Sequence, residues 1–375
     1  MAKNVLIIGG GVIGTMHAWR LIKHGFQVTQ IERDSVPVSA SVRNFGLVWV
    51  GGRLKGDELQ EALVARELWG ELANDNPGLY FRGNGSLTVA RSQEELNVLE
   101  QSIELPDAAE RGWTLLDEAE TKKLNPALRG SFKAALHCSL DAAVEPNQVL
   151  TSIRQHLLSG SGYTWVPNTE IVDVIETTNG PVAISSTGRV FEGDFAIVCP
   201  GAEHKRLFGD QLAEEPIRKV RLQMMSTAPL GENLTTSIAD GDSLRYYPAY
   251  DVPALRKLPP QSPLAQAAKL QLLMVQRVDG TLTIGDTHEY EEPFDFAMRE
   301  PEYQHLAEVA SDILGRRIPE IVRRWDGVYS QRTDGAICER LRVSPTIVVV
   351  TGPGGRGNSL SPAIAQSTLR EVGLV

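Results

Sequence analysis

The sequence predicts an α/β fold (α+β overall), in which a doubly wound parallel sheet is interleaved with a second, antiparallel-sheet domain. Three observations lead to this prediction. An apolar run, residues 5–8, opens the chain and enters a Gly-rich turn. Two further apolar runs, 194–201 and 346–350, have the composition of buried parallel strands. Short alternating segments between residues 217 and 285 favour an antiparallel sheet.

The first 32 residues contain a dinucleotide-binding fingerprint. Gly9, Gly11 and Gly14 follow a predicted strand and open a predicted helix, and a second predicted strand ends on Glu32. Gly9 permits the tight turn, Gly11 lets a pyrophosphate approach the backbone, and Gly14 allows the helix to pack closely on the sheet. Glu32 can accept both ribose hydroxyls and repels a 2′-phosphate, so the pattern predicts a Rossmann-like domain that disfavours NADP. The backbone of Val12 and Ile13, in the same turn, is also expected to bind the dinucleotide.

The next part of the chain combines elements of both domains. Leucines at helical spacing predict a helix over 57–75. We interpret residues 80–139 as an insertion outside the parallel sheet. Its predicted elements are a strand at 86–90 and charged helices near 92–104 and 117–124. The elements expected after it are a helix at 147–158, a strand near 163–166 and a β-meander around 171–192.

The C-terminal half returns to the parallel sheet. The segments RLQMMST, LRYYPAY, LLMVQRV and LTIGDTH are predicted antiparallel strands, interrupted by a Pro-rich loop. A helix at 302–315 precedes the apolar strand 346–350, which enters a second Gly-rich turn and a final helix at 361–372. The predicted first domain comprises 1–78, 140–215 and 320–375, and the second comprises 79–139 and 216–319.

Composition excludes several classes of protein. A formal net charge of −10 argues against non-specific nucleic-acid binding. The three cysteines are widely spaced, which is typical of reduced thiols in a cytoplasm, and no apolar run approaches the ~20 residues of a membrane span. No signal peptide is recognisable, so we expect a cytoplasmic protein. The His, Cys and acidic residues do not have metal-ligand spacing, and we expect no metal.

The order of these motifs resembles that of the FAD-dependent amine oxidoreductases, the superfamily of D-amino-acid oxidase, glycine oxidase and sarcosine oxidase. The GGGVIG turn with its acid, the strand DFAIVCPG and the C-terminal GPGGRGN turn carry the resemblance, which covers essentially the whole chain. It implies a Rossmann-like FAD-binding domain and a substrate-binding domain. Four segments, SVRNFGLVW, LTIGDTHEY, RRWDGVYS and VVTGPGGRGNSLS, resemble a clade found with phosphonate-breakdown genes.

The resemblance also implies where FAD binds. The two Gly-rich turns, the acid at position 32 and the loop after it are expected to surround the cofactor. Because the C-terminal loop has no cysteine, we expect FAD to be non-covalent. Besides the fingerprint residues named above, the expected FAD-binding residues are Arg33, Ser39, Ser41, Arg43, Asn44, Val172, Gly201, Gly354, Gly355, Arg356, Gly357 and Asn358.

The expected substrate site departs from the pattern of glycine oxidase. Relatives carry a Gly-Leu-Arg-Pro segment whose Arg clamps a carboxylate, whereas this chain has Tyr329 at that position. Arg332 or Arg356 is the alternative partner for an anionic group. Strand alternation in LRYYPAY puts Tyr247 on one face and Tyr246 on the other, and we expect Tyr247 to face the flavin. Tyr250 and His288 complete the expected site, with His288 and Tyr247 as the catalytic candidates.

The expected reaction is oxidation of a small, anionic amine by hydride transfer to flavin N5. Hydrolysis of the imine product and reoxidation by O₂ or another acceptor complete the cycle. The clade resemblance implies 2-aminoethylphosphonate or its N-methyl derivative as the substrate. The alternatives are a glycine/sarcosine or D-amino-acid oxidase, a dehydrogenase subunit that passes electrons to a quinone or partner protein, and a flavin-binding structural or tRNA-modifying protein.

Overall fold

The first layer of the fold is a six-stranded sheet with the order β18-β19-β12-β1-β2-β8, found in a computed structural model that describes residues 3–375. The strands are β1 (Asn4–Ile8), β2 (Gln27–Ile31), β8 (Tyr163–Val166), β12 (Phe195–Val198), β18 (Glu339–Ser344) and β19 (Ile347–Thr351). All neighbours are parallel except β18 and β19. The predicted parallel sheet is therefore confirmed, with its central strands fully buried.

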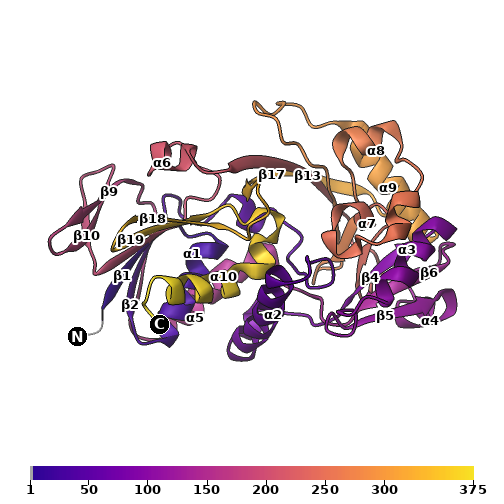
Figure 1. Ribbon diagram of the computed structural model, residues 1–375, viewed down its shortest axis with the longest axis horizontal. Helices are drawn as coiled ribbons and strands as arrows, with labels where there is room; N and C mark the ends of the chain where they lie inside the picture. Colours follow the sequence, from indigo (N-terminus) through magenta and orange to yellow (C-terminus); the bar gives the residue numbers. More distant parts are fainter. Residues whose placement is uncertain (1–2) are drawn as a thin grey trace.

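Helices cover one face of this sheet and a small antiparallel sheet covers the other (Figure 1). The helices that enclose the first core are α1 (Val12–Lys23), α2 (Asp57–Asp75), α5 (Pro146–Ser159) and α10 (Gly357–Glu371). The opposite layer contains β9 (Ile171–Thr177), β10 (Gly180–Ser185) and β11 (Val190–Glu192), which is the predicted meander, followed by α6 (Gly209–Ala213). This layering is typical of a nucleotide-binding α/β domain.

A second sheet of eight strands has the order β17-β13-β16-β15-β14-β4-β6-β5. These are β4 (Ser86–Ala90), β5 (Trp113–Asp117), β6 (Ala134–Cys138), β13 (Ile217–Thr227), β14 (Ser237–Ala239), β15 (Leu273–Gln276), β16 (Leu282–Gly285) and β17 (Ile321–Arg332). All neighbours are antiparallel except β4 and β14. The sequence division placed 320–375 in the first domain, but β17 pairs with β13 over its whole length, and this long pair joins the two halves of the molecule (Figure 1).

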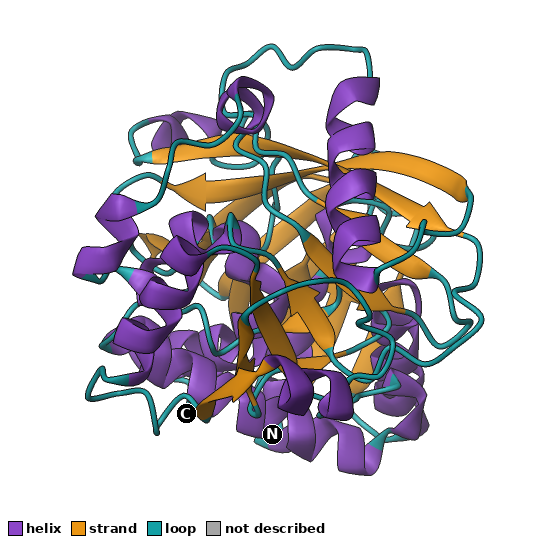
Figure 2. Ribbon diagram, turned by 90° about the vertical axis from the view of Figure 1, so that its right-hand side faces the viewer, coloured by secondary structure: helices purple, strands orange, loops and turns teal. Residues whose placement is uncertain are grey.

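Figure 2 draws helices in purple and strands in orange. The remaining helices flank the second sheet. They are α3 (Gln93–Ile103), α4 (Glu118–Leu124), α7 (Ser243–Tyr246), α8 (Pro263–Ala268) and α9 (Glu300–Leu314). Both α3 and α4 begin at a capping box, Ser92 with Glu95 and Asp117 with Glu120, which stabilises the first turn of each helix. A separate two-stranded antiparallel sheet pairs β3 (Leu47–Val48) with β7 (Ala142–Ala143).

One predicted strand was wrong. The segment LRYYPAY forms α7 and a following 3₁₀ turn at Pro248–Tyr250. Asp240 accepts hydrogen bonds from the backbone N–H of Ser243 at 3.2 Å and of Leu272 at 3.0 Å, which stabilises a turn here instead of a ladder. Because the segment is not a strand, the alternation argument fails, and Tyr246 and Tyr247 both line the same cavity.

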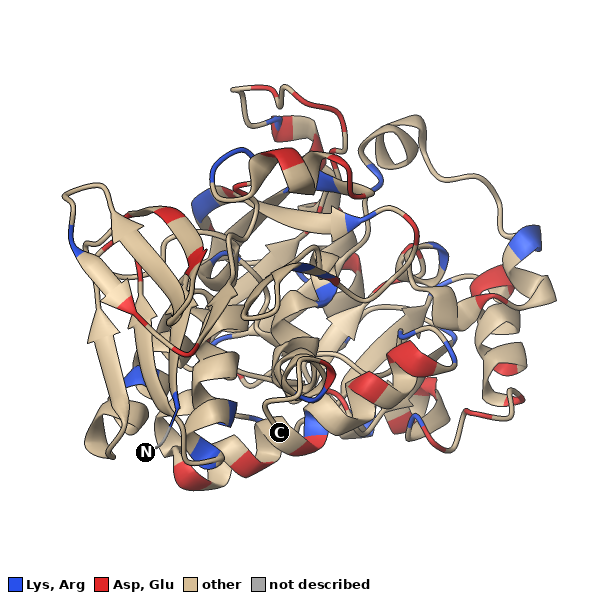
Figure 3. Cartoon of the chain, turned by 60° about the vertical axis from the view of Figure 1, so that its left-hand side comes forward, with Lys and Arg blue, Asp and Glu red and all other residues tan. Residues whose placement is uncertain are grey.

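The surface carries both signs of charge. Basic and acidic residues are interspersed in the view of Figure 3. Within residues 3–375, each helix is too short or too polar to cross a bilayer.

Candidate functional site

A large cavity of about 1010 Å³ extends from the carboxyl ends of the parallel strands to the second sheet. Its walls include the ends of β1, β2, β12 and β19, the loop 33–46, and side chains from β13 and β17. In an open α/β sheet, ligands bind outside the carboxyl ends of the strands. The cavity therefore combines the nucleotide-binding edge of one domain with a face of the other.

The first Gly-rich turn has the geometry that its sequence predicted. Gly9 has a φ of +118°, and a Cβ there would lie 2.4 Å from the carbonyl oxygen of Cys199. A Cβ on Gly14 would lie 2.2 Å from the carbonyl oxygen of Gly9, because α1 packs directly against the turn. At Gly11 a Cβ would lie 3.1 Å from Ser41 Oγ, so the absence of a side chain keeps the backbone accessible.

Glu32 and Ser41 hold the turn in place. Glu32 Oε2 accepts a hydrogen bond from the backbone N–H of Gly10 at 2.6 Å, and Oε1 accepts one from Asp34 N–H at 3.0 Å. Ser41 Oγ accepts one from Val12 N–H at 2.9 Å, in the first turn of α1. The positive dipole end and free N–H groups at this helix start favour a phosphate. The fingerprint residues, with Arg33 and Ser39, line the cavity.

The loop after β2 is held by its own side chains. Arg43 donates to the carbonyl oxygens of Val38 at 2.7 Å and Asp326 at 3.1 Å, which ties the loop to β17. Asn44 donates to the carbonyl of Ser41 at 2.9 Å and accepts from Gly46 N–H at 2.7 Å. Both residues line the cavity, and their side chains fix the loop's conformation.

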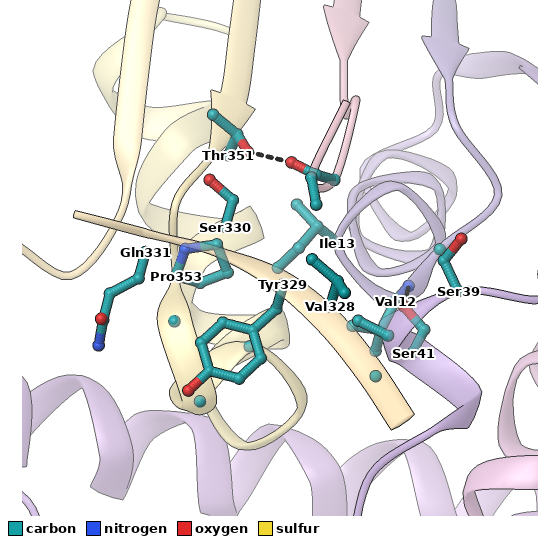
Figure 4. Close-up of a pocket in the computed structure, with 18 of the residues that line it drawn as sticks. Val12, Ile13, Ser39, Ser41, Val328, Tyr329, Ser330, Gln331, Thr351 and Pro353 are labelled. Atoms are coloured by element: carbon teal, nitrogen blue, oxygen red, sulfur yellow. Dashed lines mark hydrogen bonds between the residues drawn. The ribbon is translucent and has the colours of Figure 1, made fainter. Parts of the chain in front are cut away.

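The second Gly-rich turn closes the other end of the nucleotide-binding edge. Residues 354–356 form a 3₁₀ turn, and α10 begins at Gly357, four residues before the predicted start at 361. Asn358 donates from Nδ2 to the carbonyl of Leu47 at 2.9 Å, while its Oδ1 is buried without a partner. The carbonyl of Gly201 accepts from Thr351 Oγ1 at 2.7 Å at the same edge (Figure 4). The turn therefore presents N–H groups and an unused acceptor to a ligand.

Aromatic side chains surround the part of the cavity beside the second sheet. Tyr247 stacks on Trp49, with ring centroids 5.5 Å apart, and Tyr246 lies 4.4 Å from His288. Tyr329 projects from β17 near the Pro353 turn (Figure 4). A Cβ on Gly355 would lie 3.6 Å from the Tyr329 hydroxyl and 3.7 Å from that of Tyr246. Two phenol hydroxyls therefore meet the second Gly-rich turn.

Burial keeps these groups neutral. Desolvation raises the pKa of Tyr246, Tyr247 and Tyr329. Desolvation lowers the pKa of His288 to about 4, although its bond to the Lys269 carbonyl opposes this, and the nearby positive charges of Lys269 and Arg218 lower it further. This part of the cavity, which we call the aromatic chamber, is accordingly poorly hydrated. Its aromatic residues are Trp49, Tyr246, Tyr247, His288 and Tyr329.

The structure does not bring every expected residue to the cavity. Tyr250 is 1% exposed and lies outside the cavity lining: it stacks on Trp113 with centroids 5.4 Å apart, and its hydroxyl lies 3.2 Å from Thr88 Oγ1. Its position in a 3₁₀ turn rather than a strand explains this correction. Val172 is 54% exposed and is also outside the lining, whereas residues 169–171 belong to it.

The two arginines expected to meet an anion are already paired. Arg332 forms ion pairs with Asp334, Glu215 and Glu339. Arg356 donates to Glu58 at 3.0 Å. Both line the cavity, but carboxylates occupy their guanidinium groups. That one of them meets the substrate anion stays a prediction, and such an anion would share the guanidinium group with these carboxylates.

Sequence reasoning missed a buried loop that carries Trp49 and Arg53 into the cavity. Asp141 accepts hydrogen bonds from the N–H groups of Val50 at 2.6 Å and Gly51 at 3.0 Å. Arg111 donates to the carbonyls of Gly51 at 3.1 Å and of Arg53. Arg53 itself is 5% exposed and lies 3.6 Å from Glu58. Nothing local in WVGGRL marks this loop, because its partners come from residues 58 to 91 positions away.

The fold and cavity define a dinucleotide-binding flavoprotein of the two-domain type. A family model described as FAD dependent oxidoreductase matches residues 4–370, and the chain belongs to that family. Glycine oxidase from Geobacillus kaustophilus has the same fold, with a TM-score of 0.78 at 18% identity, over 100% of this chain and 95% of that one. Iminodiacetate oxidase from Chelativorans sp. BNC1 aligns with a TM-score of 0.72 at 21% identity, over 97% and 94% of the two chains.

A curated relative matches over a shorter stretch. This relative, an opine oxidase subunit from Agrobacterium tumefaciens (strain Ach5), is 24% identical over 236 residues, which are 60% of this chain and 63% of that protein. This chain therefore spans less than two thirds of the length of that relative.

The residues present fit FAD. Positions 9 and 14 of the turn have no room for a side chain, and Glu32 lines the cavity just after β2. At the far end of the same edge, Asn358 Oδ1 and Trp49 Nε1 are buried without polar partners. Buried polar atoms without partners are rare in proteins, and a ligand with both donors and acceptors satisfies them. The dinucleotide cradle and these unpaired polar atoms therefore both fit a single cofactor that extends along the cavity.

Proposed function

We propose that the protein oxidises a small amine that carries an anionic group, with 2-aminoethylphosphonate or its N-methyl derivative as the substrate. The observation that carries the proposal is the aromatic chamber, which is continuous with the FAD cradle and is lined by Tyr329. The sequence resemblance implies that Tyr329 stands where glycine-oxidase-like relatives have a carboxylate-binding arginine. The imine product is hydrolysed to an aldehyde and ammonia or a smaller amine, and O₂ is the proposed final acceptor, giving H₂O₂.

The relatives support the chemical class. The names glycine oxidase, iminodiacetate oxidase and opine oxidase each refer to oxidation of a compound with an amine nitrogen and a carboxylate. Within this class, a tyrosine in place of an arginine fork disfavours a planar α-carboxylate. The four segments that resemble the phosphonate-associated clade support a tetrahedral anion instead.

The chain's own residues prepare the amine for oxidation. When FAD is bound, its oxidised ring supplies a two-electron hydride acceptor. Trp49 and Tyr247 wall the chamber and exclude water, which disfavours the charged ammonium form of the substrate. The start of α10, at Gly357, faces the cavity with its N–H groups, which favour negative charge. The tight walls also orient the substrate carbon that loses hydrogen.

Anaerobic mixing of the purified holoprotein with separate amines tests the proposal. The amines are N-methyl-2-aminoethylphosphonate, 2-aminoethylphosphonate, sarcosine, glycine and D-alanine. We expect an aminophosphonate to bleach the flavin absorbance fastest. Faster bleaching by sarcosine or glycine would identify an amino-acid oxidase instead, and no bleaching by any of the five would contradict amine oxidation.

A second candidate concerns the electron acceptor. The opine oxidase relative is named as a subunit, which favours a protein that delivers electrons to a partner or a quinone. After substrate has reduced the flavin, admission of air distinguishes the two cases. Rapid return of the flavin absorbance with H₂O₂ formation supports an oxidase, and slow return supports the dehydrogenase.

Replacing Tyr329 with arginine tests the role of this position. Because Tyr329 lines the cavity, we expect Tyr329→Arg to raise kcat/KM for sarcosine relative to 2-aminoethylphosphonate by about 10- to 100-fold, the range of a bidentate charge-assisted pair. Steady-state kinetics on both substrates measure this ratio. Tyr329→Phe is the matched control, because it removes only the hydroxyl. An unchanged ratio in the arginine variant would show that this wall does not meet the anion.

A further inference from the structure

Asp286 and Gln271 are hydrogen-bonded to each other on the cavity wall. Asp286 follows the last residue of β16, and Gln271 lies just before the start of β15. The backbone N–H of Asp286 donates to the Gln271 carbonyl at 2.9 Å, and that of Gln271 donates to the Asp286 carbonyl at 3.4 Å. Gln271 Nε2 also donates to Asp286 Oδ1 at 3.3 Å. The two residues are 4% and 2% exposed, respectively. The carboxylate is thus rigidly held at a wall that a ligand can reach.

This pair lacks a cation. Gln271 Oε1 is buried without a hydrogen-bond partner. Among residues 3–375, Asp286 has hydrogen bonds from Gln271 and the backbone but no charged partner, so desolvation dominates and raises its pKa to about 8. Burying an unpaired carboxylate and an unpaired acceptor is unfavourable. A ligand with a positive charge and at least two N–H donors satisfies both groups.

We propose that Asp286 binds the ammonium group of the substrate and accepts a proton from it, while Gln271 Oε1 accepts a second N–H. The assignment rests on the proposed amine oxidation. One N–H bond of the ammonium breaks and an O–H bond forms on Asp286, which leaves a neutral amine with a free lone pair. With FAD held in its cradle, the adjacent C–H bond could then break with its electron pair leaving as hydride, for which the oxidised FAD would be the acceptor, while the nitrogen lone pair forms the C=N bond.

Asp286 suits this task better than His288. His288 Nδ1 lies 3.1 Å from the Lys269 carbonyl oxygen and donates to it, so only Nε2 has a lone pair. The pKa of His288 is lowered to about 4, whereas that of Asp286 is raised to about 8 and is closer to that of an amine. A proton therefore passes more readily from an ammonium to Asp286. This moves the proton-accepting role from the sequence candidate His288 to Asp286.

The neighbours of Asp286 do not titrate near neutral pH. The groups that face it are Tyr246 and Tyr247 from α7 and its C-terminal end, Tyr329 from β17, and His288 and Tyr290 after β16. Burial raises the pKa of each tyrosine and lowers that of His288, so all remain neutral. Arg218 and Lys269 lie over the Tyr290 ring. We therefore assign to Asp286 a rise in the flavin reduction rate with pH that levels off near pH 8, and we call this rise the pH limb.

Anaerobic stopped-flow reduction of the flavin across pH tests the assignment. In the wild-type holoprotein, the reduction rate at low 2-aminoethylphosphonate concentration should rise about tenfold per pH unit and level off near pH 8, because only the deprotonated carboxylate accepts a proton. Asp286→Asn should lose this limb and reduce about 100-fold more slowly at pH 8. Its rate should recover partly at higher pH, where the free amine is more abundant.

Asp240→Asn is the matched control. Asp240 is 3% exposed, burial raises its pKa to about 7, and it lies outside the cavity lining. Its substitution should leave the limb near 8 in place. If Asp286→Asn does not retain FAD, Asp286→Glu serves as the second variant, because it keeps a carboxylate and should preserve the limb.

A binding measurement separates amine recognition from general damage. Flavin absorbance perturbation reports Kd for ethylphosphonate, which lacks the amine, and the early perturbation on mixing reports Kd for 2-aminoethylphosphonate. Asp286→Asn should weaken only the second, by about tenfold or more. An unchanged pH limb, or equal weakening of both ligands, would overturn the assignment. Absence of reduction in the wild-type protein by every amine would instead overturn the proposed function.

Discussion

Gly14→Val is expected to yield a protein that purifies without flavin. A Cβ at this position lies 2.2 Å from the carbonyl oxygen of Gly9, which is backbone, and 3.2 Å from the side chain of Ile7. Helix α1 must therefore move away from the turn, and with it the N–H groups that face the phosphates. Overpacking of this kind costs about 1–3 kcal/mol, so we expect about 10- to 100-fold weaker FAD binding. Fluorescence titration of the apoprotein with FAD measures this loss.

Gly70→Ala provides the comparison, because Gly70 is also helical. A Cβ on Gly70 lies 3.6 Å from its nearest neighbour, Arg66 Nη1, which is an ordinary contact. This variant should bind FAD normally and gain about 0.5–1 kcal/mol of helix stability. A Gly14→Val protein with a full complement of FAD would contradict the close approach of α1 to the turn.

Asp141→Ala should cause the largest loss of stability among single substitutions near the site. Asp141 is fully buried and accepts hydrogen bonds from Val50 N–H, Gly51 N–H and, at 2.6 Å, Ser86 Oγ. Truncation leaves these three donors unsatisfied, at about 1–3 kcal/mol each. We expect the free energy of unfolding to fall by about 3–5 kcal/mol, measured by urea titration at saturating FAD.

The same substitution should slow flavin reduction. The backbone that Asp141 holds carries Trp49 and Arg53 into the cavity, so a looser loop misplaces both walls of the chamber. Asp141→Asn is the control, because its Oδ1 still accepts from both N–H groups, and it should lose no more than about 1 kcal/mol. If Asp141→Ala unfolds at the same urea concentration as wild type, the proposed clamp on this loop is wrong.

The nucleotide-binding half was predictable because its signals are local. The fingerprint glycines, the acid at position 32 and the apolar strands determine conformation over a few neighbouring residues, and the connection through α1 makes β1 and β2 parallel neighbours. The pairing of β13 with β17 was harder to predict from the sequence, because the two strands lie far apart in the chain. The boundary at residue 320 accordingly missed that β17 belongs to the second sheet.

The substrate side was harder to predict, because residues distant in the chain decide which side chains meet. LRYYPAY has the composition of a strand, yet Asp240 turns it into a helix end, which brings Tyr246 to the cavity and removes Tyr250 from it. Arg332 was a candidate partner for an anion in the sequence, but Glu215 and Glu339 pair with it in space. Asp286 carried no sequence signal beyond its place before His288.

The sequence by itself determined the fold class, the FAD cradle and the family, since tight turns and buried strands depend on short-range stereochemistry and on apolar patterning. Only the tertiary structure decided which polar groups are free to act. Whether an arginine is paired, a carboxylate desolvated or an amide oxygen orphaned depends on neighbours contributed by other strands. For this reason Arg332 and Arg356 are engaged by acids, whereas Asp286 and Gln271 remain open to an amine.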